Sequence, residues 1–271
     1  ASCPTRLGKN DTAVGVGCHP SRPPSCFTSP NWVKWHEAWQ NVCSNMAESC
    51  KVIAALIRHG DYQQLPDTPS AHQPFPLSDV GIEQARTCAA RLITDIAQNG
   101  WSLDPSIDSS KLLRAWQTAS LISQTLRQRG QANCCIAEFD DLAERSLGIA
   151  GNLSLTQIND VIAADPRCDP LPTDWKTNSD FRLPVPGAES LIDAGARVAA
   201  HVRARIAASA ERKGDTVLKV FVGHGAAIRH AAFHLGIIDR DDIARLSMHH
   251  ARPVYVTTQG GTWQHIGGTW K

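Results

Sequence analysis

Two histidines of the 271-residue sequence occur in the same local pattern. His59 comes after a continuous apolar run, residues 52–57, and His224 after a second buried-strand pattern, residues 217–222, and each histidine is followed by a glycine. Such runs are typical of strands buried on both faces of a parallel sheet. Ligands of open α/β sheets bind beyond the carboxyl ends of the strands, so we expect both imidazoles in one crevice. Arg58, next to His59, supplies a planar set of donors suited to phosphate or carboxylate, so the pattern indicates an anion-binding site.

Further histidines and cysteines indicate a metal site only weakly. His230 and His234 are four residues apart, as in zinc proteases, but Ala231 stands where the general-base glutamate of HExxH would be. We therefore interpret both as packing or surface residues, and we assign no role to His249 and His250. A zinc site would need five N-terminal residues that lack a paired CxxC spacing: Cys18, His19, Cys26, His36 and Cys43. We expect neither a metal nor a cofactor.

The elements that must position the two histidines follow from the hydrophobic periodicity. From residue 51 onward, strand patterns alternate with helix patterns, which predicts a mainly parallel sheet. Ser78 is the expected N-cap of a long helix, and apolar residues at helical spacing from 112 to 126 predict a second. The remaining expected elements are helices over 155–164, 188–212 and 226–235, a strand over 134–137, and a terminal hairpin of 252–258 and 262–266.

Composition narrows the class of protein. The sequence has 27 Lys and Arg against 26 Asp and Glu, so its net charge is +1, and no apolar run approaches the ~18 residues of a membrane span. We therefore expect a soluble protein that binds neither nucleic acid nor membranes. Nine cysteines would leave at least one thiol unpaired in an oxidised protein. The compartment stays open, with the cytoplasm slightly favoured, and the oligomeric state is not predicted.

The first fifty residues differ from the rest. Residues 1–28 are rich in Gly, Pro, Ser and Cys without a regular period, which is typical of an irregular extension. An amphipathic helix is expected after Ser29 and Pro30, with one face formed by Trp32, Trp35, Trp39, Cys43 and Met46. This face is expected to dock on the main domain, and the competing interpretation is a tryptophan stripe that binds a partner. The predicted organisation is therefore an extension over 1–50 and a main domain over 51–271.

Over about residues 51–267 the sequence resembles the histidine phosphatase superfamily, in its phosphoglycerate-mutase-like branch. The resemblance rests on six motifs in the order that the family has them: LIRHG at 56–60, PLSDVGIEQA at 76–85, SSKLLRAWQTA at 109–119, ERSLG at 144–148, PGAES at 186–190 and VGHGAAIR at 222–229. The arginine-histidine-glycine triplet alone is a weak signal, whereas the whole series is specific. The resemblance implies a three-layer α/β/α domain with a mainly parallel central sheet.

The resemblance also implies roles for five residues. His59 matches the nucleophile that becomes phosphohistidine, and Arg58, Arg114 and His224 match the pocket that holds the phosphoryl group. Glu144 matches the proton donor to the leaving oxygen. Phosphoryl transfer consists mostly of positioning and charge stabilisation, so such a pocket can work without a metal. The expected activity is hydrolysis of a phosphorylated small molecule or phosphoprotein.

Some features of the sequence leave competing functions open. The sequence Asp-Tyr-Gln-Gln at 61–64 stands where the mutases have a Trp-Asn pair, which favours a phosphatase over a phosphoglycerate-type mutase. A metal-dependent hydrolase is a second competing function, and a catalytically weak scaffold that binds phosphorylated partners is a third. Asp61 is the alternative proton donor. In residues 152–185, where the family varies, Arg167, Lys176 and Arg182 either meet an anionic substrate or, as slightly favoured, face solvent.

Overall fold

The computed structural model describes residues 50–131, 134–211 and 216–271. Its centre is a six-stranded sheet with the strand order β3-β2-β4-β1-β5-β6. The first four of these strands are parallel, and β5 and β6 form an antiparallel hairpin at one edge. The strands are β1 (Val52–Arg58), β2 (Ser102–Ser110), β3 (Cys135–Phe139), β4 (Val217–Gly223), β5 (Pro253–Gln259) and β6 (Thr262–Gly267).

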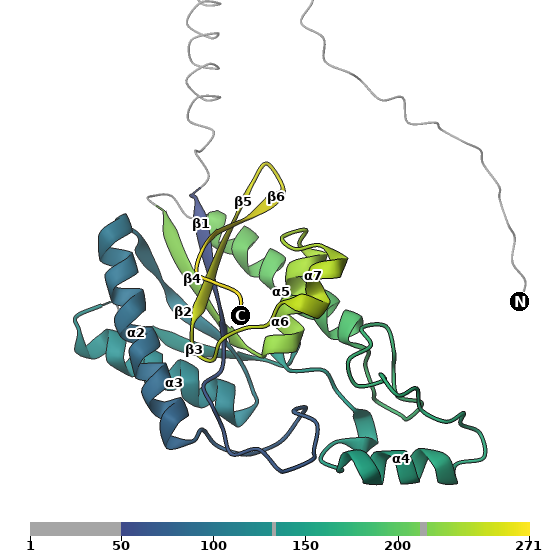
Figure 1. The fold of residues 1–271 in the computed structure, drawn as a ribbon. Helices are drawn as coiled ribbons and strands as arrows, with labels where there is room; N and C mark the ends of the chain where they lie inside the picture. Colours follow the sequence, from purple (N-terminus) through teal and green to yellow (C-terminus); the bar gives the residue numbers. More distant parts are fainter. Residues whose placement is uncertain (1–49, 132–133, 212–215) are drawn as a thin grey trace, which may run out of the picture. The chain divides into compact units, whose positions relative to one another are not determined.

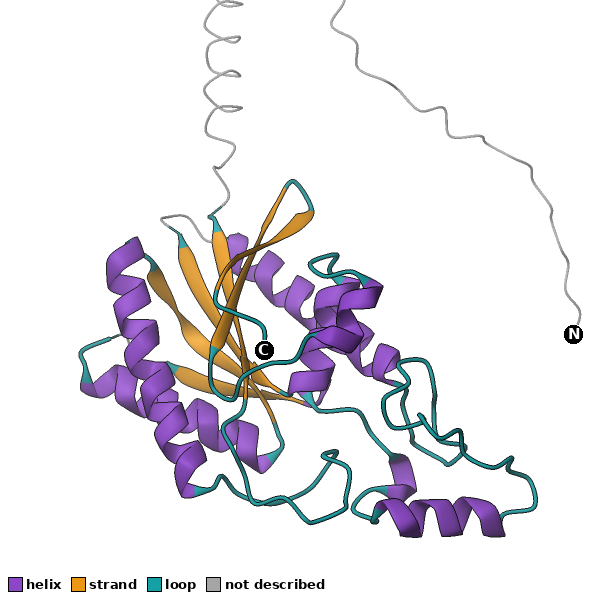
Figure 2. Ribbon diagram, in the orientation of Figure 1, coloured by secondary structure: helices purple, strands orange, loops and turns teal. Residues whose placement is uncertain are grey.

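Helices cover both faces of the sheet, as Figures 1 and 2 show. One face packs against α2 and α3 through a core that includes Leu92 and Ile122, and the other packs against α5 and α6 through a core that includes Val198 and Ile228. The helices are α2 (Asp79–Asn99), α3 (Leu113–Gln128), α4 (Leu155–Ala164), α5 (Leu191–Ala210), α6 (Gly225–His234) and α7 (Arg240–Arg245). The expected three-layer α/β/α fold with a mainly parallel sheet is confirmed.

The expected helices form where their caps and apolar faces predict them. Ser78 caps α2 by accepting a hydrogen bond from the backbone N–H of Gly81, and the face that includes Ala85, Leu92 and Ile96 is buried. The helix expected over 188–212 begins later, at Leu191, because Ser190 forms a capping box with Asp193. The terminal hairpin is confirmed.

Strand β2 is the main element that the periodicity did not predict. Its sequence, SLDPSIDSS, contains a proline and two aspartates, and it shows no continuous apolar run. The buried carboxylates of Asp104 and Asp108 are neutralised by Lys219 of the neighbouring strand β4, at 3.4 Å and 2.6 Å. The interior of this part of the sheet is therefore charged, and a search for apolar runs overlooks it.

A smaller core lies at the end of the sheet where the parallel strands finish. It packs α4 against the loops on either side and includes Leu147, Ile158, Trp175 and Leu183. Figure 1 shows this segment beside the loops that follow β1 and β3. The segment that the sequence marks as variable therefore forms a wall beside the strand ends.

The expected N-terminal extension lies outside the described residues, apart from Cys50, so it stays a prediction. The same holds for the tryptophan helix and for the N-terminal zinc site. None of the helices in the described part of the chain combines the length and the apolar character that a membrane span requires.

Candidate active site

The two histidines meet at the ends of neighbouring parallel strands. In the register of β1 and β4, Arg58 lies opposite Gly223, and the backbone N–H of His59 donates to the carbonyl of Gly223 at 2.9 Å. His59 and His224 follow these positions directly, and their ring centroids are 5.0 Å apart. The prediction that both imidazoles lie in one crevice is thus consistent with this placement.

The backbone around His59 fixes which of its ring nitrogens carries the proton. Nδ1 lies 2.7 Å from the carbonyl oxygen of Gly60, which can only accept, so Nδ1 donates and Nε2 of the neutral ring keeps its lone pair. The ring is 2% exposed, and burial together with the nearby charges of Arg114 and Arg58 holds the pKa of His59 well below its usual value. At neutral pH, His59 is therefore an uncharged imidazole whose Nε2 carries no proton.

Arg114 is the residue that joins the two histidines. It lies at the start of α3, is fully buried, and its Nε donates to Nε2 of His59 at 3.1 Å. Its Nη2 donates to Nδ1 of His224 at 3.1 Å and to the carbonyl of Ala71 at 2.7 Å, and its Nη1 donates to the carbonyl of Gln73 at 2.9 Å. Burial lowers the pKa of the guanidinium, and two carbonyls fix its orientation.

His224 is held between a donor and a hydroxyl. Because the arginine can only donate, Nδ1 of His224 accepts from Arg114, so the neutral ring carries its proton on Nε2, which lies 3.0 Å from Oγ of Ser110. His224 is fully buried, and burial followed by the charge of Arg114 holds its pKa well below the usual value. His59 lines the cavity described below, whereas His224 does not.

Arg58 reaches the same site from the end of β1. Its Nη1 donates to the carbonyl of Met248 at 3.0 Å, while its buried Nε has no hydrogen-bond partner among the described residues. Gly225 makes room for this side chain, because a Cβ there would lie 2.9 Å from Cδ of Arg58. Gly60 is equally constrained, since a Cβ there would lie 2.5 Å from the carbonyl oxygen of Gly81.

Glu144 points its carboxylate into the same space from the loop after β3. Only 7% of the residue is exposed, and its Oε1 accepts from the backbone N–H groups of Arg145 at 3.0 Å and Ala227 at 3.1 Å. Ala227 lies in the first turn of α6, whose N–H groups lack partners within the helix. The second oxygen, Oε2, accepts no hydrogen bond from any residue that the structure describes.

A single ion pair holds the loop of Glu144 on both sides. Arg197 of α5 forms a two-pronged ion pair with Glu189, with N–O distances of 3.0 Å and 2.8 Å, and its Nη1 also donates to the carbonyl of Ala143 at 3.2 Å. Glu189 in turn accepts from the backbone N–H of Ser146 at 3.0 Å. The residue before Glu144 and the second residue after it are therefore fixed by one pair.

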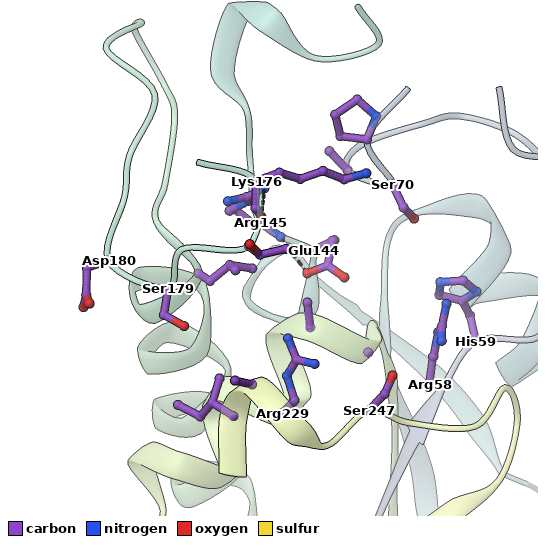
Figure 3. A pocket seen from close by; sticks show the side chains of 18 of the residues that line it. Arg58, His59, Ser70, Glu144, Arg145, Lys176, Ser179, Asp180, Arg229 and Ser247 are labelled. Carbon is purple, nitrogen blue, oxygen red and sulfur yellow. Dashed lines mark hydrogen bonds between the residues drawn. The ribbon is translucent and has the colours of Figure 1, made fainter. Parts of the chain in front are cut away.

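A cavity of about 680 Å³ opens over these groups and is lined by Arg58, His59 and Glu144 (Figure 3). Its other charged lining residues are Arg145, Lys176, Asp180, Arg229 and Arg240. Arg240 forms an ion pair with Asp180, so the remaining cations outnumber the carboxylate of Glu144. The cavity is therefore suited to an anion.

The charges of the variable segment divide between the cavity and solvent. Lys176 lines the cavity, whereas Arg167 forms an ion pair with Asp165 at 2.6 Å and Arg182 forms one with Asp193 at 2.6 Å, both on the exposed surface. All three side chains are exposed, as the sequence slightly favoured, but Lys176 also borders the cavity.

The structure adds supporting residues that the sequence did not single out. The ring of Tyr62 stacks under the guanidinium of Arg114 at 4.6 Å, and the hydroxyl of Thr118 accepts from the backbone N–H of Gly60 at 3.0 Å. His250, which had no expected role, lies with its Nδ1 2.9 Å from the carbonyl of His59. Tyr62 and Thr118 stand within or next to the motif segments, but only their tertiary contacts reveal what they do.

The alternative proton donor has another partner. Oδ2 of Asp61 accepts from the hydroxyl of Ser78 at 2.5 Å, beside the N-terminus of α2, and Asp61 does not line the cavity. The interpretation of His230 and His234 as packing residues agrees with their contacts: Nε2 of His230 bonds to Oγ of Ser179 and Nε2 of His234 to the carbonyl of Ile192, both at 3.0 Å. Within the described ranges, no group of three or more His, Cys, Asp or Glu side chains is placed to hold a metal ion.

Known structures of several enzymes share this fold. A mycobacterial glucosyl-3-phosphoglycerate phosphatase is 22% identical with a TM-score of 0.58, and the alignment covers 80% of this chain and 97% of the other. A putative alpha-ribazole-5'-P phosphatase from Escherichia coli is 18% identical, with a TM-score of 0.58 and coverage of 81% and 94%. A phosphoglycerate mutase from Bacillus anthracis is 19% identical, with a TM-score of 0.60 and coverage of 82% and 94%.

Among curated proteins, a sequence search finds no match. The sequence of residues 54–267 does match a family, the one described as the histidine phosphatase superfamily, branch 1. That match spans both strand-end histidines, Arg114 and Glu144, and it takes in the whole sheet except the first two residues of β1. The chain belongs to the histidine phosphatase superfamily, branch 1.

Proposed function

We propose that the protein hydrolyses phosphomonoesters through a phosphohistidine formed on Nε2 of His59. The observation that carries this proposal is the pairing at this nitrogen: the Gly60 carbonyl holds the proton on Nδ1, and the buried guanidinium of Arg114 lies 3.1 Å from Nε2. A lone pair and a fixed positive charge thus face the same small space. This is the arrangement that a nucleophile and an oxygen-binding group need for phosphoryl transfer.

In the proposed first step, the lone pair of Nε2 attacks phosphorus and the P–O bond to the leaving group breaks. Arg58 and Arg114 hold the phosphoryl oxygens, joined by His224 once its Nε2–H turns from Ser110 to an oxygen, and the free Nε–H of Arg58 offsets their charge. Glu144, in its protonated form, gives its proton to the leaving oxygen. Oε2, which has no described partner, is the oxygen that carries this proton.

In the proposed second step, water attacks phosphorus and the P–N bond breaks, which restores the lone pair on His59. Glu144, now a carboxylate, takes a proton from the water. The products are an alcohol and inorganic phosphate, and the enzyme returns to its starting state.

The same phosphoenzyme would serve a mutase, and the superfamily contains enzymes of both kinds. Hydrolysis is favoured because the sequence Asp-Tyr-Gln-Gln at 61–64 stands where the mutases have a stretch with a Trp-Asn pair, and the ring of Tyr62 packs against Arg114. Incubation with 3-phosphoglycerate separates the two activities: a phosphatase releases inorganic phosphate, whereas a mutase forms 2-phosphoglycerate without loss of phosphate.

The test of the nucleophile is to trap the intermediate. Wild-type protein quenched during turnover of a ³²P-labelled phosphomonoester is expected to carry an acid-labile, alkali-stable label, and His59→Ala to carry none and to lose at least about 10⁴-fold in kcat. A label on Ser, Asp or Cys would refute the assignment. Activity is expected to survive dialysis against a strong chelator, and a loss restored by a divalent ion would favour a metal-dependent hydrolase. Binding without turnover would favour the scaffold.

A further inference from the structure

We infer that the cavity contains a second anion-binding position, formed by Arg229, Arg145 and Lys176, and that the substrate is a phosphomonoester with a second anionic group. This inference rests on the proposed function and names the substrate class of the same site. Among the buried side-chain nitrogen and oxygen atoms that the structure describes, two lack a hydrogen-bond partner: Nε of Arg58 and Nε of Arg229. Both arginines line the cavity.

Arg229 is held in place with one donor left unused. Its Nη1 donates to the carbonyl of Leu246 at 2.6 Å, which anchors the guanidinium between α6 and the segment that follows α7. Burial lowers the pKa of this arginine, while the nearby carboxylate of Glu144 acts in the opposite direction. A buried donor without an acceptor is costly, so a ligand oxygen at Nε would stabilise the site.

Arg145 and Lys176 face this arginine across the cavity. Nη2 of Arg145 donates to the carbonyl of Lys176 at 3.3 Å, so the two residues are joined. Figure 3 shows them on one side of Glu144 and Arg229 on the other, with His59 beyond. The loop that carries Lys176 is fixed as well, because Ser179 bonds to His230 at 3.0 Å through its hydroxyl.

The positive charge of this position exceeds the negative charge that the described residues place beside it. Arg229, Arg145 and Lys176 form no ion pair with any residue that the structure describes, in contrast to Arg240 and Arg182 nearby, which pair with Asp180 and Asp193. Glu144 offers one negative charge, and none in the protonated form that the first step requires. The transferred phosphoryl group binds Arg58 and Arg114. A second anion is therefore needed to neutralise the charges of Arg229, Arg145 and Lys176.

The chemistry of the donors defines the ligand. Two guanidinium groups and one ammonium group favour a carboxylate or a phosphate over a neutral hydroxyl. A volume of about 680 Å³ accommodates a sugar phosphate with such a second group. The expected substrate is thus a phosphomonoester whose leaving group carries a second acidic group, either a carboxylate or a phosphate.

Matched substrate pairs test this inference. In 3-phosphoglycerate a carboxylate replaces one hydroxymethyl group of glycerol 3-phosphate, and glucose 1,6-bisphosphate adds a phosphate to glucose 6-phosphate. We expect wild-type kcat/KM to be higher for the doubly anionic member of at least one pair, and the preferred pair identifies carboxylate or phosphate. Arg229→Gln is expected to lower kcat/KM about 10- to 100-fold for that member and less than about 3-fold for its partner.

Two further variants keep the test independent of folding. Lys176→Gln changes an exposed side chain and should reproduce the selective loss in smaller measure, whereas Arg127→Gln on α3 removes the same charge away from the cavity and should change neither substrate. No preference in either pair, or equal losses for both members in Arg229→Gln and in Lys176→Gln, would overturn the inference.

A binding experiment separates this inference from the proposed function. The same four compounds are titrated calorimetrically into His59→Ala protein with and without Arg229→Gln. Selective weakening of the doubly anionic compound supports the second position even if no phosphomonoester is turned over, in which case only the proposed function fails. Turnover of p-nitrophenyl phosphate without selective weakening refutes the second position and leaves the proposed function intact.

Discussion

Two clusters of buried charge, one formed by residues of β2, β4 and α5 and the other at the candidate active site, differ in how their charges are balanced. In the Lys219 cluster, formed by Lys219, Asp104, Asp108 and Arg205, each ion meets an opposite one: Nζ of Lys219 lies 2.6 Å from Asp108, and Nε of Arg205 also lies 2.6 Å from Asp108. In the active-site cluster, formed by Arg58, Arg114, Arg145, Arg229 and Glu144, cations outnumber the single carboxylate, and two buried nitrogens have no acceptor.

The difference separates a structural from a functional use of buried charge. The Lys219 cluster is complete without a ligand, so it only needs to keep its ions paired. The active-site cluster keeps its donors fixed by carbonyls, as Arg114 is by Ala71 and Gln73, and it leaves positive charge for a ligand to neutralise. Such fixed, uncompensated charge is what stabilises the charge that develops during phosphoryl transfer.

The largest expected effect comes from removing the only carboxyl proton of the active-site cluster. Glu144→Gln keeps the size of the side chain but cannot protonate the leaving oxygen. Its kcat/KM should fall about 10²–10⁴-fold for an alkyl phosphate and far less for p-nitrophenyl phosphate, whose leaving group needs no proton. Steady-state kinetics with both substrates measures this. Equal losses would mean that Glu144 only positions the substrate, and Asp61→Asn would then be the next variant to compare.

Breaking the Lys219 cluster is expected to lower the stability of the fold without a specific loss of activity. Lys219→Met leaves Asp104 and Asp108 without their shared cation, and breaking such a buried pair costs about 3–5 kcal/mol of unfolding free energy. Arg145→Met is the matched change in the active-site cluster. It should alter the unfolding free energy by less than about 1 kcal/mol, because Arg145 forms no ion pair with a described residue and its removal leaves no carboxylate without a paired cation. Urea unfolding of both variants checks this. Similar losses in the two would contradict the distinction between the clusters.

An added anion should act on one cluster alone. Inorganic phosphate at 100 times its dissociation constant should stabilise the folded protein by about 2.7 kcal/mol, and sodium chloride of equal ionic strength should not. Arg114→Met is expected to remove the effect and Lys219→Met to retain it. Thermal unfolding at several phosphate concentrations measures both. Phosphate stabilisation that survives in Arg114→Met would place the anion elsewhere.

The last expected effect is a change of stability with pH. The folded-state pKa values of His59 and His224 lie well below 6.5, and that of His230 is lowered to about 4, chiefly by burial. The unfolded chain therefore binds protons first, so each histidine contributes stability above pH 6.5 that is lost as the pH falls, by about 1.4 kcal/mol per pH unit.

Asp108 behaves in the same sense, but over a lower pH range. Its hydrogen bonds and Lys219 lower its pKa to about 2, so its contribution is complete above pH 3.8 and declines only below that value. Unfolding free energies between pH 8 and 4 should thus decrease through the histidines, and His230→Gln should reduce the slope below pH 6.5. An unchanged slope in that variant would show that His230 is not held neutral.

How much of the site can be predicted from the sequence depends on the distance over which its contacts are made. His59 and His224 follow from local pattern, because a buried-strand pattern and a glycine place each histidine at a strand end. Arg114 and Glu144 required the order of family motifs, since neither lies in a pattern that distinguishes it from a surface residue. Arg145 and Arg229 stand inside those motifs without showing any role.

The sequence by itself determined the strands β1 and β4, the principal helices with their serine caps, and the end of the sheet where the candidate site lies. These features depend on period and on caps, which operate within a few residues. Tertiary structure alone decided that Arg114 bonds to both histidines, that Arg197 and Glu189 fix the loop of Glu144, and that Lys176 reaches the cavity. Most of these contacts join segments separated by tens of residues, so they depend on strand register and loop packing that no local pattern encodes.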